Sequence, residues 1–167
     1  MNHQLLMAVL IFAPFVGFLI NGLRYKIHSG NLAGGIAIGA VFISFICSLF
    51  LVFTLASLSS PISINFFDWI FVDNLKIRVG FVVDQISALM ILVVTGVGAL
   101  IHIFSIGYMH HDKGAAKYFA YLNLFIFNML LLVLGDNMLV MFVGWEGVGL
   151  CSYLLIGFLF TDKDKAA

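Results

Sequence analysis

Five long apolar segments constrain the fold of this chain more than any other feature of its sequence. Their approximate bounds are residues 5–23, 32–58, 86–108, 118–134 and 137–160. About 20 apolar residues suffice for a helix to cross the hydrocarbon core of a bilayer. The chain is 63% hydrophobic and 10% charged, whereas a soluble domain is about half apolar and about a quarter charged. We therefore expect an all-α membrane protein with about five transmembrane helices.

The first apolar segment contains Pro14, and proline removes a backbone N–H from a helix. We expect a local bend or break in the helix at this residue. The segment has no positive charge before it and no small-x-small cleavage site after it. It is therefore interpreted as a retained helix rather than a signal peptide.

Between the second and third apolar segments the hydrophobic period changes to two. Residues 62–66 and 75–79 alternate, Val72-Asp73-Asn74 supplies turn residues between them, and Pro61 precedes the first run. This pattern predicts a short β-hairpin outside the bilayer. The chain then divides into three parts, at residues 1–58, 59–83 and 84–167.

Lysine and arginine predict the orientation of the helices in the membrane. Six of these residues fall in alternate loops on one side, namely Arg24, Lys26, Lys113, Lys117, Lys163 and Lys165. Only Lys76 and Arg78, in the hairpin, fall on the other side. The positive-inside rule makes the first side cytoplasmic and places the hairpin on the outer side. The net charge is zero, which gives no reason to expect nucleic acid as a partner.

Glu146 is the only glutamate in the chain and the only charge between residues 137 and 160. An acidic group at the centre of a membrane helix costs about 2.5–3.5 kcal/mol on insertion scales. We therefore expect the side chain to face protein or water, either protonated or paired with a cation. A carboxyl group in such surroundings can accept and release protons. The structural alternative is a neutral acid that only hydrogen-bonds a neighbouring helix.

Helical spacing suggests neighbours for Glu146. Glu146, Gly149 and Tyr153 share one helix face. A very short turn joins the last two apolar segments, so these should pack antiparallel. Asn128 and Glu146 lie about 10 Å and 13 Å from that turn by helical rise. Asn128 is therefore a candidate hydrogen-bond partner of Glu146, or alternatively a residue that only joins two helices.

His102 is the second ionisable residue well inside an apolar segment. Together with Thr95, Gly98 and Ser105 it forms a small and polar stripe at helical spacing, which should face other helices. The titration range of histidine suits a proton relay. The alternative is a neutral histidine bonded to a backbone or hydroxyl oxygen. No cysteine in the chain has metal-ligand spacing.

Glycines and aspartates predict packing and capping. Two glycine clusters allow close helix contact, at residues 34, 35 and 39 and at residues 144, 147 and 149. Neither cluster follows a strand, which argues against a nucleotide-binding loop. Asp84 and Asp136 lie at the outer starts of helices, where an acidic residue favours the helix dipole. We expect both to be helix caps.

Four stretches of the chain resemble a known family. They are Val83-Asp84-Gln85-Ile86-Ser87-Ala88-Leu89-Met90, residues 100–110 around His102, Leu134-Gly135-Asp136-Asn137, and GWEGVGLCSYLLIGF at 144–158. Together with the hairpin before them, they resemble the N-terminal part of the subunit L family of proton-translocating NADH:quinone oxidoreductase. This enzyme is respiratory complex I, and the mitochondrial counterpart of the family is NADH dehydrogenase subunit five.

The resemblance implies a mechanism and a role for two residues. Subunits of this family are similar to cation/proton antiporters, and redox chemistry elsewhere in the complex drives proton transfer through them. The family's glutamate on the fifth helix matches Glu146, and in the family it pairs with a lysine on the seventh helix. The family's helix-three histidine region matches His102, which extends the relay hypothesis. Residues 84–167 would then begin the proton-translocating module.

The resemblance also implies the surroundings of the chain. We expect no cofactor in the chain itself, with NADH, FMN, iron–sulfur clusters and quinone in other subunits. The expected partners are other membrane-arm subunits, the lipid bilayer, protons and water. The expected location is the bacterial plasma (inner) membrane, with the mitochondrial inner membrane as the alternative.

Members of the family are three to four times as long as this chain. The partner lysine, the broken helices and the second half of the inverted repeat have no counterpart in it, so it resembles a truncated subunit. Inverted repeats place an ion site between matching elements, and half of one repeat cannot close a path. Two other interpretations remain: the large subunit of a multisubunit Na⁺/H⁺ antiporter, and a membrane scaffold that transports nothing.

Overall fold

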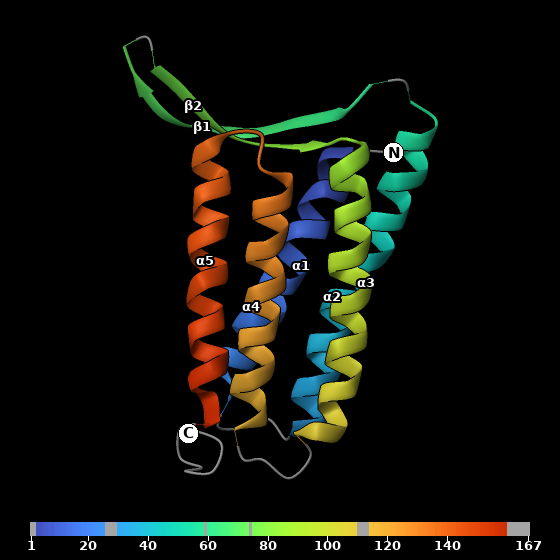
Figure 1. Ribbon diagram of the computed structural model, residues 1–167, viewed down its shortest axis with the longest axis vertical. Coiled ribbons are helices and arrows are strands. Elements are labelled where there is room, and N and C mark those ends of the chain that lie inside the picture. Colours follow the sequence, from blue (N-terminus) through green and yellow to red (C-terminus); the bar gives the residue numbers. More distant parts are fainter. Residues whose placement is uncertain (1–2, 26–29, 59, 74, 110–113, 160–167) are drawn as a thin grey trace.

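The computed structural model describes residues 3–25, 30–58, 60–73, 75–109 and 114–159. Within these residues the chain forms five long helices, namely α1 (His3–Leu23), α2 (Gly30–Ala56), α3 (Gln85–Tyr108), α4 (Ala115–Leu134) and α5 (Met138–Ile156). All five are long and apolar enough to cross a membrane. They stand side by side in one bundle (Figure 1). The predicted all-α membrane fold is confirmed.

The predicted hairpin between the second and third helices is also confirmed. Strand β1 (Ile62–Val72) pairs antiparallel with β2 (Leu75–Val83), and both are longer than the alternating runs that predicted them. Two register shifts, between Asn65 and Phe67 and between Asp68 and Ile70, mark bulges in β1. Such bulges bend and twist a hairpin. The hairpin lies across one end of the bundle (Figure 1).

Helix α4 is the centre of the bundle. It packs against α1, α2 and α3 as well as against α5, whereas α5 packs chiefly on α4. The main apolar core combines residues of α1 to α4, and Val140 at the start of α5, with the base of the hairpin, where Phe81 and Val83 are buried. Helix α5 therefore lies at the edge of the bundle, and most of its surface is not covered by the other described helices.

Pro14 does not break α1, contrary to one of the two outcomes expected at this residue. The helix is continuous from His3 to Leu23. Proline has no N–H to donate to the carbonyl oxygen four residues earlier, which here is that of Leu10. The hydroxyl group of Ser44 on α2 donates to this oxygen over 2.8 Å. A side chain of the neighbouring helix therefore supplies the hydrogen bond that Pro14 removes.

The two predicted aspartate caps have different outcomes. Asp84 is the N-cap of α3, and its carboxylate accepts from the backbone N–H of Ser87 over 2.7 Å while the Ser87 hydroxyl accepts from the N–H of Asp84. The prediction for Asp136 is wrong, because the N-cap of α5 is Asn137. The side-chain oxygen of Asn137 accepts from the N–H groups of Leu139 and Val140.

Helix α5 is shorter than its apolar segment. It ends at Ile156, and Gly157–Leu159 forms a single 3₁₀ turn. Glycine has a low helix propensity and commonly terminates helices. Residue 160, where the predicted segment ends, lies outside the described residues.

Candidate functional site

Glu146 lies near the middle of α5, on a side of the helix that the described part of the chain leaves exposed. Its side chain is exposed, as are the residue Gly149 and the side chain of Tyr153, which share its helix face as predicted. No hydrogen bond or ion pair joins the Glu146 carboxylate to another residue that the structure describes. The chain's own helices therefore do not provide the protein contact expected for this acid.

Two glycines determine which side of α5 turns toward α4. A Cβ atom at Gly144 would lie 2.8 Å from Leu132 Cα, and a Cβ atom at Gly147 would collide with the side chain of Asn128. Consecutive residues of a helix point about 100° apart. Glu146 lies between these two glycines in sequence, so the contact that buries the glycine side turns the carboxylate away from α4.

The expected hydrogen bond between Asn128 and Glu146 is not formed. The Asn128 amide is buried and donates to the carbonyl oxygen of Leu124 over 3.0 Å and to Cys151 Sγ over 3.5 Å. The Asn128 side chain packs against Gly147, the residue after Glu146, and joins α4 to α5. The spacing argument matched depths along the two helices, but it did not fix the rotation of α5. The role of Asn128 in proton transfer remains a prediction.

His102 lies at the centre of the bundle and is 1% exposed. Its Nδ1 atom lies 2.7 Å from the carbonyl oxygen of Gly98, and its Nε2 atom lies 3.1 Å from Oδ1 of Asn123 on α4. The ring of Phe119 packs beside it, with 6.4 Å between ring centroids. The two ionisable residues singled out in the sequence are therefore not close together. Glu146 is on the outer side of α5, whereas His102 is inside the bundle.

The polar stripe of α3 faces other helices, as predicted. Thr95, Gly98, His102 and Ser105 are all buried. The hydroxyl group of Thr95 lies 3.2 Å from that of Ser48 on α2, and that of Ser105 lies 3.4 Å from Tyr118 on α4. Polar contacts therefore occur at three successive levels along α3, with His102 at the middle level.

Asn123 is a site residue that the sequence reasoning missed. It is fully buried, and besides the contact with His102 its amide packs against Gly17 of α1. Its Nδ2 atom has no hydrogen-bond partner among the described residues. An asparagine inside an apolar segment was a visible signal, but spacing alone could not relate α4 to the stripe on α3.

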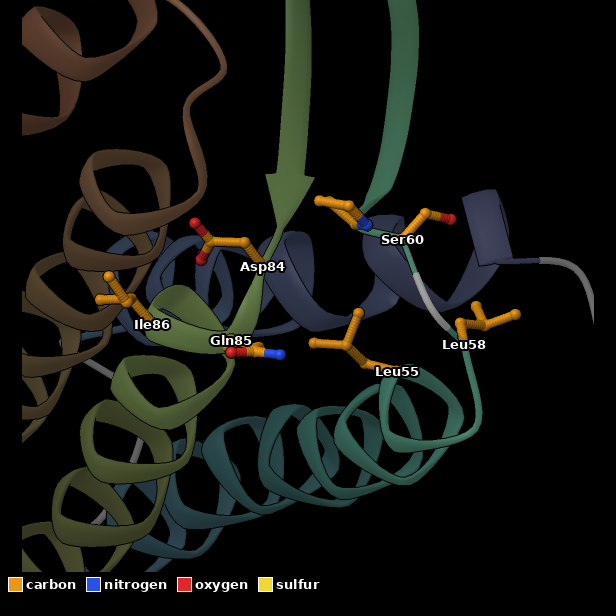
Figure 2. Close-up of a pocket in the computed structure, with 7 residues that line it drawn as sticks. Leu55, Leu58, Ser60, Asp84, Gln85 and Ile86 are labelled. Atoms are coloured by element: carbon orange, nitrogen blue, oxygen red, sulfur yellow. The ribbon is translucent and has the colours of Figure 1, made fainter.

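A pocket at the hairpin end involves neither Glu146 nor His102. It has a volume of about 300 Å³ and lies between the end of α2 and the start of α3, where Leu55, Leu58, Ser60, Asp84 and Gln85 line it (Figure 2). The Ser87 backbone N–H and hydroxyl groups hold the pKa of the Asp84 carboxyl below its ordinary value. Because that carboxylate already caps a helix, the pocket is explained by the local fold.

No group of three histidine, cysteine, aspartate or glutamate side chains that could hold a metal ion occurs in the described part of the chain. Cys47 and Cys151 are buried free thiols.

The fold and these residues define a class: a helical membrane protein with an acid near the middle of its fifth helix that pairs with no other described residue, and a buried histidine at its centre. Residues 69–119 match the family described as "NADH-Ubiquinone oxidoreductase (complex I), chain 5 N-terminus". This region begins in the hairpin and includes all of α3.

Individual relatives extend the match to the whole chain. The sequence is 41% identical over 169 residues to the NADH-quinone oxidoreductase subunit L of Rickettsia typhi, which covers 100% of this chain and 26% of the relative. It is 40% identical over 163 residues to that of Escherichia coli, covering 97% of this chain and 27% of the relative. For the Campylobacter jejuni protein the identity is 43% over 159 residues, with 95% and 25% covered.

The chain is thus homologous, along its whole length, to the N-terminal region of NADH-quinone oxidoreductase subunit L. It spans about a quarter of the length of these relatives.

Proposed function

We propose that this chain forms the N-terminal part of a membrane-arm subunit of a proton-translocating NADH:quinone oxidoreductase, and that Glu146 takes up and releases protons in it. The exposed position of Glu146 at mid-depth of a membrane helix is the observation that carries the proposal. A charge facing acyl chains costs several kcal/mol, so the uncovered face of α5 needs protein or water against it.

The neighbours of Glu146 support an interface rather than a lipid-facing surface. Gly149 has no atom near the position of a Cβ, so this face offers a shallow gap beside the acid. Tyr153, 75% exposed, ends the same face with a hydroxyl group. A further helix of a longer subunit would place its side chains against this face, and a basic residue there would hold the carboxylate in its charged form.

The chemistry assigned to this chain is proton transfer alone. The Glu146 carboxylate accepts a proton from a water molecule on one side and releases it to a basic group or water on the other. A nearby cation favours the charged form, and its departure favours the neutral form. NADH, flavin, iron–sulfur and quinone chemistry would belong to other subunits, whose contacts with this one lie in the membrane arm. The membrane would be the bacterial inner membrane.

Replacement of Glu146 in the assembled complex tests the proposal. We expect Glu146→Gln to lower the number of protons translocated per NADH oxidised, because glutamine cannot carry a proton at this position. Leu150→Gln is a matched control, since Leu150 lies one turn further along α5 and is exposed. It adds an amide near the same face but keeps the acid. Normal translocation by a fully assembled Glu146→Gln complex would favour the scaffold interpretation instead.

A further inference from the structure

The hydrogen bonds of His102 constrain its charge state. Its two ring nitrogens face two oxygen atoms, the carbonyl oxygen of Gly98 and Oδ1 of Asn123. Both oxygens can only accept hydrogen bonds, and a neutral imidazole carries a single N–H. Two N–H donors on one ring exist only in the imidazolium ion. The arrangement in this structure therefore suits a protonated His102, with one N–H directed at each oxygen.

A half-turn of the Asn123 amide suits the neutral ring equally well. The amide oxygen and the amide nitrogen have nearly the same size, so the half-turn changes no packing. Nδ2 would then donate to Nε2 of His102, while Nδ1–H continues to donate to Gly98. In the present orientation Nδ2 has no hydrogen-bond partner among the described residues and lies against Gly17. After the half-turn Oδ1 would lie there, where a Cα–H of glycine can donate weakly to it.

No charged side chain in the described part of the chain contacts the imidazole. The group that can adjust its hydrogen bonding to the charge of the ring is therefore the Asn123 amide. The contacts on α4 are Asn123 and Phe119. On α1 the residue beside the amide is Gly17, and Ala40 of α2 lies against the same point of Gly17; neither carries a charge. The titratable residue next to Phe119 on α4 is Tyr118, and its hydroxyl group lies 3.4 Å from that of Ser105.

We propose that the Asn123 amide reverses its orientation when His102 gains or loses a proton, which makes the pair a reversible proton-holding site between α3 and α4. When Nε2 takes up a proton from water, Asn123 changes from donor to acceptor. When the proton leaves, the amide turns back. Only the use of this proton in transport rests on the proposed function, because the two states follow from the hydrogen bonds of the pair.

Nitrogen NMR of the unmodified chain in detergent tests the pair without any assumption about transport. We expect the side-chain ¹⁵N signals of His102 and Asn123 to change with the same midpoint during a pH titration. An Asn123 signal that does not follow the protonation of His102 would overturn the proposal.

Two substitutions of Asn123 in the assembled complex test the link to transport. Asn123→Asp gives a fixed acceptor that favours the imidazolium, so the pH profile of proton translocation should shift upward by about one unit or more. Asn123→Leu has a similar shape but no partner for Nε2, so the profile should shift downward. Ser48→Ala is the matched control, because it removes a buried α2–α3 contact at another level of the stripe and should leave the profile in place.

The two proposals fail in distinguishable ways. Asn123 variants that assemble poorly but keep the unchanged pH profile of proton translocation would show a purely structural role for the pair. Two variants that shift this profile in the same direction would show the same. If Glu146→Gln translocates normally while the NMR titrations of His102 and Asn123 still coincide, the transport function fails and the proton-holding pair stands.

Discussion

The side-chain amide of Asn137 donates to the backbone carbonyl oxygen of Arg78 over 2.8 Å. This contact joins the N-cap residue of α5 to strand β2 of the hairpin. Beside it, the N–H of Asp136 donates to the carbonyl oxygen of Gly80 over 3.1 Å, and Asp136 Oδ2 lies 3.6 Å from Nε of Arg78. The turn between α4 and α5 thus lies along β2 almost as a third strand, and it positions the helix that carries Glu146.

Substitution of Asn137 should separate its two functions. Asn137→Ala removes both the cap and the contact with β2, and we expect it to lower the free energy of unfolding by about 1–2 kcal/mol. Asn137→Ser keeps a capping oxygen but loses the amide donor and adds no charge beside Asp136, so it should cost less. Equilibrium unfolding of the chain in mixed detergent micelles measures both. Equal losses for the two variants would contradict a separate contribution from the cap, and no loss in the variant that keeps the cap would contradict a contribution from the contact with β2.

Gly144 should tolerate a larger side chain worse than any exposed glycine of the same helix. In Gly144→Ala the added Cβ would meet the backbone of α4 near Leu132, which forces the two helices apart and costs about 1–3 kcal/mol. Gly149→Ala is the control, because open space surrounds that position. Unfolding of the 167-residue chain in detergent compares the two. An equal effect on stability would show that α5 does not pack on α4 through its glycine side.

The cap of α3 should make stability depend on pH in the acidic range. The hydrogen bonds from Ser87 lower the pKa of the folded Asp84 carboxyl below its unfolded value. Its contribution is therefore present above the unfolded pKa and is lost as the pH falls through the folded pKa. We expect Asp84→Asn, which keeps a capping oxygen, to flatten this part of the pH profile of the unfolding midpoint. The carboxyl is largely open to solvent, so the effect should be small. An unchanged slope in Asp84→Asn would show that other carboxyls cause the acid dependence.

The hydroxyl group of Ser44 should matter because of Pro14. Ser44→Ala leaves the buried carbonyl oxygen of Leu10 without the donor that replaces the missing proline N–H, a loss of about 1–3 kcal/mol. In the double variant Pro14→Ala, Ser44→Ala the helix can supply its own N–H, so part of the loss should be recovered. Thermal unfolding in detergent measures the coupling. Purely additive effects of the two substitutions would argue against this compensation.

The sequence predicted the elements well because the signals for them are local. Apolar length located the five helices, and the alternation after Pro61 located the hairpin. The predictions that failed concern the rotation of a helix about its axis and the contacts between helices. Asn128 and Glu146 match in depth, but glycine packing turns the acid away. Asn123 could be related to His102 only through the packing of α3 on α4. Asp136 and Asn137 are adjacent polar residues, and the contact with β2 decides which of them caps the helix.

The most direct test of the central proposal is the environment of residue 146 in the assembled complex. We would introduce Glu146→Cys in a background with Cys47→Ala and Cys151→Ala, and label it with a water-soluble or a lipid-soluble thiol reagent. If the acid lines a hydrated path against another helix, the water-soluble reagent should react and the lipid-soluble reagent should not. Reaction with the lipid-soluble reagent alone would show that the side chain faces the acyl chains and would contradict the proposed role in proton transfer.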